Sequence, residues 1–345
     1  MSCCCTIIPA AVLARLAEDA SLSDGERKGL ADTIALDAKL RRVRVANAEI
    51  NRIAGKVNGL AGLVQLAAAP GIEVYDCQTT MSLPGTRLTN PSQSADATAV
   101  RAFNETTQVA AFFSQAFGRS SIDNQGMTLL SSIHYGSGYN NAFWNGAQMT
   151  YGDGNGSLFV DFTLSTDVIA HELTHGVTER TSAFVYTNEA GGLNESMSDV
   201  FGSMFRQWRK NQTVAQADWL IGKEILGPAA LAAGYTCLRS MKDPGGAHCL
   251  STQPSHYRDY RPGMDPHDSS GIANYAFYLA ATAVGGQSWV KVGKIWYAAL
   301  TNYGRTPNAT FAKFADRCRQ SASSLFPGDS AVYNAVDTAW TTVLT

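Results

Sequence analysis

The stretch 168-VIAHELTHG-176 places His171 and His175 four residues apart, directly after a short apolar run. Residues four apart share one face of a helix, so both imidazoles can reach a single metal ion while Glu172 lies beside it. A catalytic zinc ion takes three protein ligands and leaves a fourth position for water. The stretch therefore predicts a helix that supplies two zinc ligands and a neighbouring carboxylate.

A second stretch, 191-GGLNESMSD-199, contains the ligand that is still needed. We expect Glu195 to be the third zinc ligand. Asp199 lies one helical turn later, where its carboxylate can accept the spare N–H of a ligand histidine. The alternative, two histidines satisfied within a helical core, leaves Glu195 unexplained.

The overall composition sets broad limits. A chain of 345 residues corresponds to about two domains of ordinary size. With 45% apolar and 16% charged residues, it can bury a sizeable core. Lys and Arg number 27 against 29 for Asp and Glu, so the net charge of −2 gives no reason to expect binding to nucleic acid or to an anionic membrane.

The N-terminus has neither the basic start nor the long apolar core of a classical signal peptide, and no apolar run reaches about 18 residues. We therefore expect a protein without a membrane span, made in the cytoplasm and released, if at all, by a non-classical route.

The seven cysteines do not form an ordinary disulfide framework, because three of them, Cys3 to Cys5, are adjacent. We expect mostly free thiols. Cys237 and Cys249 are close enough in sequence to pair around a Pro-Gly-Gly turn, and that pairing stays open. The N-terminal cysteines can act as a soft metal-capping group, but an exposed tail is the favoured interpretation.

Several further motifs, in order along the chain, resemble those of the thermolysin-like neutral metallopeptidases. They are 139-YNNAFWNG-146, 151-YGDG-154, 171-HELTH-175, 194-NESMSD-199, 238-LRSM-241 and 267-HDSSGI-272. The resemblance covers about residues 71–345. It implies an α+β, two-lobed fold, in which a β-rich N-terminal lobe (71–166) and a helical C-terminal lobe (167–345) are joined by the zinc-binding helix, and the protein is expected to be a monomer.

The local patterns agree with that division. Alternation and turn residues predict strands near 72–76, 128–135 and 148–151, with one helix at 97–117. From residue 166 onward, helical periodicity predicts helices at 167–178, 191–209, 271–283, 288–303, 310–325 and 329–343.

The resemblance also implies roles for individual residues in hydrolysis of a peptide or protein substrate. Glu172 is the general base that takes a proton from zinc-bound water, while Tyr186 and His267 stabilise the oxyanion. Asn194 accompanies Asp199 behind the ligands. Asn141 and Ala142 match the edge strand that pairs with the substrate backbone, and Arg239 matches the residue that bonds substrate carbonyls.

An apolar pocket is implied for the side chain that follows the cut bond. Its walls are Phe159, Phe162, Val168, Ile221, Ile225 and Leu238. Such a pocket favours Leu, Ile or Phe, although an apolar wall separates neighbours by only about 1–3 kcal/mol per methylene. Phe162 is larger than the usual residue, which predicts a shallower pocket. The implied function is a zinc endopeptidase; a catalytically silent zinc-fold binding protein and a zinc exopeptidase or esterase are the alternatives.

One position departs from the family pattern. An aspartate is expected five residues before His267, but Pro262 is found there. Asp265 and Asp268 are the nearest acids; Asp265 can orient the ring from another angle, and the choice stays open. The remaining histidines, His134, His248 and His256, have no metal-ligand spacing and are interpreted as structural.

Residues 1–50 differ in composition from the rest and predict two short helices. Ile7-Ile8-Pro9 with Leu13 resembles the short propeptide of the protealysin-like branch of the family. This resemblance implies an autoinhibitory prosegment that covers the cleft in cis and is removed by cutting in a connector at 51–70. A permanent helical hairpin is the alternative.

Many family members bind a pair of calcium ions near the zinc helix through clustered carboxylates. Asp167 and Asp218 remain here, but Arg206, Leu220 and Lys223 occupy positions expected to be acidic. We therefore expect no double calcium site, with Arg206 and Lys223 neutralising the acids, Arg206 through a bidentate fork. The alternative is a drifted loop whose charges face solvent.

Overall fold

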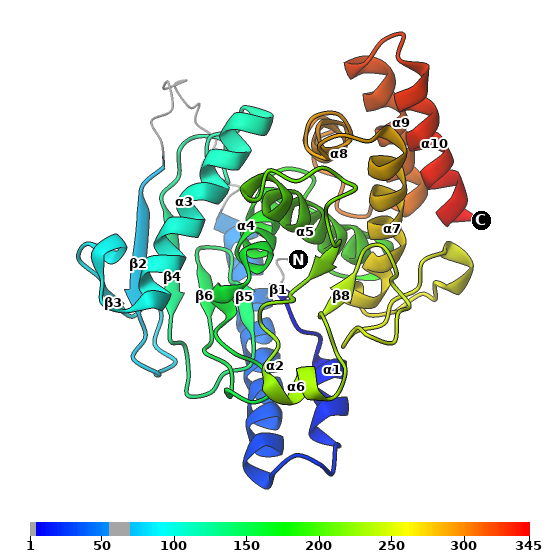
Figure 1. Ribbon diagram of the computed structural model, residues 1–345. Coiled ribbons are helices and arrows are strands. Elements are labelled where there is room, and N and C mark those ends of the chain that lie inside the picture. Colours follow the sequence, from blue (N-terminus) through cyan, green and yellow to red (C-terminus); the bar gives the residue numbers. More distant parts are fainter. Residues whose placement is uncertain (1–4, 55–69) are drawn as a thin grey trace.

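The computed structural model describes residues 5–54 and 70–345, with side chains described for 5–42 and 70–345. Within these residues the chain forms a sheet-containing lobe and a helical lobe (Figure 1). This matches the α+β, two-lobed fold expected from the sequence.

A six-stranded mixed sheet organises the first lobe. Its spatial order is β1 (Cys5–Thr6), β5 (Ala142–Trp144), β6 (Met149–Tyr151), β4 (Leu129–Ile133), β2 (Ile72–Asp76) and β3 (Thr86–Arg87). Strands β2, β4 and β6 run parallel, whereas β5 and β1 run antiparallel to their neighbours. The outermost strand, β1, comes from the N-terminus of the chain.

Helix α3 (Ala97–Phe117) packs on this sheet and has the bounds that the sequence predicts. The Asp96 carboxylate accepts a hydrogen bond from the Thr98 N–H, which caps the start of the helix. Gly118, with φ of +67°, ends it in the left-handed conformation that glycine adopts without strain.

The second lobe is helical. Its helices are α4 (Thr166–Arg180), α5 (Asn188–Arg209), α6 (Pro228–Ala232), α7 (Pro266–Val284), α8 (Val292–Thr301), α9 (Phe311–Leu325) and α10 (Ser330–Leu344). The second lobe also contains a short two-stranded sheet, formed by β7 (Leu220–Ile221) and β8 (Arg239–Ser240). Short 3-10 helices occur in both lobes, at Pro91–Gln93, Phe162–Leu164 and Tyr257–Asp259. No helix in the described ranges is both long and apolar enough to cross a membrane.

Helices α4 and α5 form the buried centre, as Figure 1 shows. A Cβ atom at Gly202 of α5 would lie 2.7 Å from the carbonyl oxygen of Asp167 in α4. Only glycine permits this approach, which brings the two helices close enough for their polar side chains to meet.

Two helix lengths differ from the sequence prediction. Helix α7 begins at Pro266 rather than residue 271, because the Asp265 side chain caps it by accepting from the His267 N–H and Pro266 fits the first turn. Helix α8 is shorter than the predicted 288–303. The other ends shift by a few residues at most.

The N-terminal segment also differs from prediction. It holds a short helix, α1 (Ala10–Ala17), but the second, α2 (Asp24–Ala54), is long and passes residue 50, where we expected the connector to begin. Ser23 and Glu26 start α2 with reciprocal backbone hydrogen bonds, and no Gly or Pro interrupts residues 46–54. Residues 55–69, most of the expected connector, lie outside the described residues.

Candidate active site

Helices α4 and α5 bring the expected metal ligands together. His171 and His175 extend from α4 and Glu195 from α5, and all three are buried. The two histidine Nε2 atoms lie 3.0 Å apart. Glu195 reaches to 3.4 Å from His171 Nε2 with one oxygen and to 3.5 Å from His175 Nε2 with the other.

The hydrogen bonds behind these ligands fix the imidazole protons. The Nδ1–H of His171 donates to Asp199 at 2.9 Å, and the Nδ1–H of His175 donates to the Asn194 amide oxygen at 2.9 Å. Asn194 is itself oriented, because its amide nitrogen donates to the Phe184 carbonyl at 3.0 Å. Both Nε2 atoms therefore point lone pairs toward each other.

This donor set fits a metal cation. Two imidazole lone pairs and a buried carboxylate repel one another unless positive charge lies between them. One Glu195 oxygen, Oε2, is also buried without a hydrogen-bond partner in the described part of the chain. Nitrogen and carboxylate donors in this number are those of a catalytic zinc site.

Asp199 is the centre of a larger network. Besides His171, it accepts hydrogen bonds from Arg239 at 2.8 and 2.9 Å and from the Asn274 amide at 2.9 Å. Burial alone would raise the pKa of Asp199, but the Arg239 guanidinium and His171 hold it well below its usual range. Asp199 therefore stays ionised and orients the histidine.

Glu172 lies beside the ligands, fully buried. Neither of its carboxylate oxygens has a hydrogen-bond partner among the described side chains. Burial raises the pKa of Glu172 to about 8. A carboxylate with a pKa near neutrality can accept and return a proton.

Tyr186 and His267 face the same centre from the opposite side. The Tyr186 hydroxyl hydrogen-bonds Glu195 and lies 3.1 Å from His267 Nε2. The His267 Nδ1 lies 2.8 Å from Asp265, the residue that also caps α7. Asp265 therefore occupies the orienting position that the sequence left open between it and Asp268. Burial opposes protonation of His267, but Glu195 and Asp265 raise its pKa above the usual value.

The N-terminal strand occupies the sheet edge at which we expect substrate to bind. Strand β1 pairs antiparallel with β5, with Cys5 opposite Trp144 and Thr6 opposite Phe143. The Thr6 carbonyl lies 2.6 Å from His267 Nε2.

Backbone contacts continue beyond the strand. The Ile7 N–H donates to the Ala142 carbonyl at 3.1 Å, and Arg239 donates to the Ile7 carbonyl at 2.9 Å. The Asn141 side chain bonds both backbone groups of Ile8, at 2.9 and 3.1 Å. Each of the three residues expected to bind substrate backbone therefore binds the N-terminal segment.

The apolar positions also come together. The six expected wall residues, Phe159, Phe162, Val168, Ile221, Ile225 and Leu238, are all fully buried. Ile7, Ile8 and Leu13 belong to the same hydrophobic cluster, and Pro9 is buried as well. These side chains of the N-terminal segment are therefore part of the protein core rather than exposed to solvent.

Cys5 corrects one expectation from the sequence. It is not part of an exposed tail but is buried in β1, and its sulfur lies within 4.8 Å of ligand atoms of His175 and Glu195. This position fits the alternative of a soft metal-capping group, which the run of three cysteines left open as to residue. Cys3 and Cys4 lie outside the described residues.

Asp37 is a buried residue of the N-terminal segment that no sequence motif identified. It is buried on α2 and hydrogen-bonds the Tyr139 hydroxyl and, at 2.9 Å, the Asn141 amide. Burial raises the pKa of Asp37 to about 6, although these hydrogen bonds act to lower it. No local pattern marks this residue, because its partners are far away in sequence.

A second charge cluster lies at the opposite ends of α4 and α5. Arg206, 5% exposed, is 3.1 Å from Asp218, 2.7 Å from Glu224 and 3.9 Å from Asp167. A single Arg206 nitrogen, Nη2, donates to both Asp218 and Glu224. The expected bidentate pairing of two guanidinium nitrogens with one carboxylate is therefore not found. Lys223 lies 3.7 Å from Asp218 and is half exposed.

The three remaining histidines differ in surroundings. His134 bridges Asp96 and Asp153 at 2.8–2.9 Å, and His256 contacts Ser255 at 2.9 Å. His248, interpreted from sequence as structural, instead lies beside the Cys237 and Cys249 thiols. Those thiols are not bonded to each other in a disulfide.

Sequence comparison with known proteins covers most of the chain from residue 56 onward. The model for the thermolysin metallopeptidase catalytic domain matches residues 56–179, and the model for the alpha-helical domain matches residues 182–344. An extracellular metalloprotease of Pectobacterium carotovorum subsp. carotovorum is 42% identical over 281 residues, covering 78% of this chain and 80% of that protein. Protease PrtS of a Photorhabdus species is 38% identical, covering 77% and 74%.

A solved structure extends the likeness to the N-terminal segment. It is the precursor of protealysin, a metalloproteinase from Serratia proteamaculans, with a TM-score of 0.82 and 36% identity. The match covers 98% of this chain and 99% of that one.

Proposed function

The chain belongs to the thermolysin metallopeptidase family, whose members are zinc metalloenzymes, and from this premise we propose that it is an endopeptidase made as a latent precursor. It cuts internal peptide bonds on the N-terminal side of bulky hydrophobic residues. The observation that carries the proposal is the facing pair of histidine lone pairs beside Glu195, with the buried Glu172 carboxylate, which has no partner among the described side chains, next to them.

One zinc ion would be held by His171, His175 and Glu195. Bound there, zinc supplies an acidified water molecule and polarises the peptide carbonyl. Glu172 takes the proton of the attacking water and returns it to the departing amine. Its burial supports this role, because a carboxylate in a dry site has a pKa close to that of the working solution.

Charge that develops on the carbonyl oxygen is stabilised by Tyr186 and His267. Asp265 accepts the Nδ1–H of His267 and, with Glu195, raises the pKa of the ring, so that the protonated imidazole presents its Nε2–H to the reacting oxygen. The Thr6 carbonyl, 2.6 Å from His267 Nε2, supports this role, because it lies where a substrate carbonyl would be bound.

Specificity comes from the apolar wall residues and from β5. Ile7 follows the Thr6 carbonyl, and the two backbone bonds of Ile7 go to Ala142 and Arg239. In this register Ile7 stands in for the substrate residue after the cut bond. A fully buried, apolar surrounding favours Leu, Ile or Phe at that position, with the larger Phe162 making the pocket shallow.

Latency follows from the same contacts. The segment 5–42 takes the substrate edge, the Arg239 side chain and the apolar pocket, so a substrate cannot bind while it is docked. Cys5 supports this, since a thiolate near His175 and Glu195 can replace the water that zinc needs. Cutting between residues 51 and 70 after folding, followed by dissociation of the N-terminal segment, should release activity; full activity in the uncut chain would contradict the proposal.

The second charge cluster supports a proposal about calcium. Arg206 supplies the positive charge that Asp167, Asp218 and Glu224 require, and calcium would have to enter beside it. We therefore infer that the chain has no double calcium site.

The decisive test is Glu172→Ala, assayed by casein zymography with a zinc chelator in parallel. The variant should keep the zinc content of the unmodified protein and lose hydrolysis, because the base is not a ligand. If processing is autocatalytic, the variant also stays uncut. Near-normal turnover in the variant would show that the assignment of the base is wrong.

A further inference from the structure

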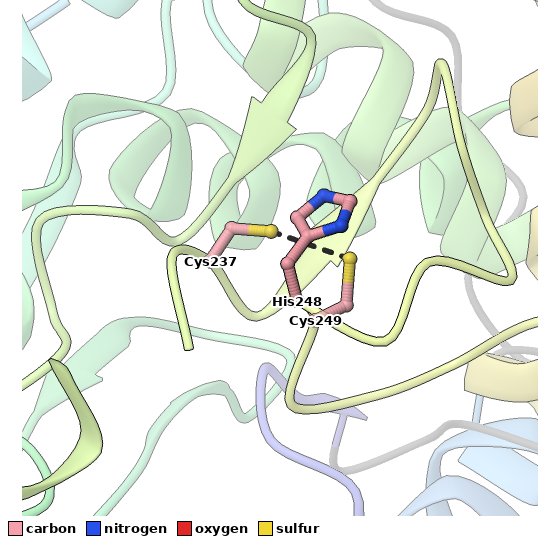
Figure 2. Close-up of side chains that lie close together, drawn as sticks. All are labelled: Cys237, His248 and Cys249. Atoms are coloured by element: carbon pink, nitrogen blue, oxygen red, sulfur yellow. Dashed lines mark hydrogen bonds between the residues drawn. The ribbon is translucent and has the colours of Figure 1, made fainter. Parts of the chain in front are cut away.

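Two buried thiols and an imidazole meet in the helical lobe, apart from the catalytic cluster. Cys237 and Cys249 are joined by an isolated parallel β-bridge, and their Sγ atoms lie 3.4 Å apart. The His248 ring lies over the two sulfurs, as Figure 2 shows, and one ligand atom from each residue lies within 4.8 Å of the others. Both thiols are buried and His248 is half-buried.

The backbone fixes this arrangement from both sides. The Thr236 N–H donates to the His248 carbonyl at 2.9 Å, and the Leu250 N–H donates to the Cys237 carbonyl at 3.0 Å. These bonds hold the segment 236–237 beside the segment 248–250, which carries both His248 and Cys249. The ligand atoms are therefore positioned before any ligand binds, which lowers the entropic cost of binding.

The turn that precedes His248 is built around its side chain. A Cβ atom at Gly246 would lie 2.4 Å from His248 Cε1 and 2.5 Å from an Asp243 carboxylate oxygen. Any other residue at this position would push the imidazole and the carboxylate away. Asp243 lies 4.0 Å from His248 Nδ1 and is exposed, so it faces the imidazole from the solvent side.

We propose that Cys237, His248 and Cys249 form a second metal site, which binds one thiophilic divalent cation of the zinc type. Two sulfurs and one imidazole nitrogen match the ligand preference of zinc and not that of calcium or magnesium. Both thiols lose their protons on binding, so the two thiolates neutralise the charge of the ion within a buried site. Water fills the fourth position, and the half-buried His248 side gives the ion access.

A disulfide explains less of this geometry. Around a tetrahedral ion with bonds of about 2.3 Å, two sulfurs lie roughly 3.8 Å apart. The observed 3.4 Å is close to that and far from the ~2.05 Å of a disulfide bond. A disulfide also needs no third ligand. The space that Gly246 leaves for the His248 imidazole would then have no role.

The site would stabilise the segment that carries Arg239. Cys237 lies two residues before Arg239 in sequence, and Leu250, next to Cys249, accepts a hydrogen bond from Arg15 of α1 through its carbonyl. An ion at this place therefore holds together the backbone that binds both the catalytic Asp199 network and the N-terminal segment. Its role is structural, since it lies outside the group of residues around Glu172.

The test is the metal content of the full chain, purified with a phosphine reductant and without chelator. We expect Cys237→Ser, Cys249→Ser and His248→Ala each to hold one equivalent of zinc less than the unmodified protein. Cys318→Ala, which changes another buried cysteine, is the matched control and should lose none. Because the comparison is a difference, the result does not depend on the content of the catalytic site.

A second measurement guards against variants that fail to fold. In the unmodified protein, alkylation followed by peptide mapping should label Cys237 and Cys249 more slowly with zinc present. Cobalt should give thiolate charge-transfer absorption that is weaker in Cys249→Ser, the remainder coming from Cys5 at the catalytic site. Equal zinc content in all variants, with no zinc protection of the thiols, would overturn the proposal. Isolation of the unreduced chain two hydrogens lighter, with Cys237 linked to Cys249, would overturn it in favour of a disulfide.

Discussion

Helices α4 and α5 contribute to two charge clusters that differ in where their positive charge comes from. The first is fully buried, whereas Asp218 and Glu224 of the second are partly exposed. Around His171, His175 and Glu195, donor atoms face one another across a gap. Around Asp167 and Arg206, a guanidinium group lies between the acids. The first cluster needs an ion from solution, whereas the second is complete within the chain.

The difference shows what turns a charge cluster into a site. A buried carboxylate is costly unless it is paired, so each cluster must acquire positive charge. Where the chain provides it as arginine, the acids are neutralised and no position remains for a ligand. Where the chain provides only lone pairs, a metal ion must bind and brings an open coordination position with it.

The largest expected effect comes from breaking the first cluster. His175→Ala removes a ligand and should lower kcat/KM of the processed enzyme by at least about 10³-fold, since several kcal/mol of charge stabilisation in the transition state are lost. Zinc content and kcat/KM on a hydrophobic peptide measure this. His256→Ala, outside the cluster, is the control; a His175 variant with normal zinc and activity would contradict the ligand assignment.

Breaking the second cluster should affect stability and leave the chemistry intact. Arg206→Met removes the internal cation from three acids, and loss of one partner of a buried ion pair costs about 3–5 kcal/mol. Denaturant unfolding of the full chain measures the change. The half-exposed Lys223 is the matched control, and Lys223→Met should cost less than about 1 kcal/mol.

The same comparison can be tested without a mutation. If Arg206 replaces a calcium pair, the melting temperature of the unmodified protein should not respond to millimolar calcium or to a calcium-selective chelator. A calcium-dependent rise of many degrees would mean that the second cluster also depends on an external ion.

The variant His267→Ala tests which residues of the first cluster hold the metal ion and which contact the reacting groups. Turnover should fall by about 10²–10³ with zinc content unchanged, because His267 acts on charge that develops in the transition state. Steady-state kinetics on the processed enzyme distinguish the cases. An effect confined to KM would give His267 a binding role only.

Asp37 offers a third case, a buried acid for which a proton supplies the missing charge. Docking raises the pKa of Asp37 to about 6, from an ordinary value near 4. Protonation of Asp37 therefore favours docking of the N-terminal segment; this favourable free energy has its full value below about pH 4 and is lost as the pH rises through about 6. After cutting, the N-terminal segment should bind roughly tenfold more weakly at pH 7 than at pH 5.

The measurement is the fraction of active enzyme in the cut, unseparated complex at each pH. Asp37→Asn should remove most of the dependence, which separates Asp37 from Arg41 and His267, the other charged groups that act on it. Tighter binding at the higher pH would contradict the sign.

The sequence was sufficient for features that depend on local spacing. His171 and His175 are four residues apart on one helix, and Glu195 follows on the next, so their meeting depends on one helix crossing. The start of α7 was misplaced because the cap at Asp265 was not recognised, and this left the acid partner of His267 undecided.

Long-range contacts could not be predicted in the same way. Asp37 meets Tyr139 and Asn141 only because α2 of the N-terminal segment docks on the sheet-containing lobe. His248 lies beside the cysteine thiols in a turn where a side chain at Gly246 would displace the imidazole. In each case the residue type was visible, but its neighbour was determined by tertiary packing.

The pairing of β1 with β5 has a consequence for the kinetics of release. While the chain is whole, the N-terminal strand is tethered to the enzyme and has an effective concentration set by the linking segment, which favours rebinding after every opening. A cut in that segment breaks none of the contacts between β1 and β5. It only makes rebinding bimolecular, so activity should appear after a delay that shortens on dilution, and a concentrated sample of fully cut protein should still be inhibited.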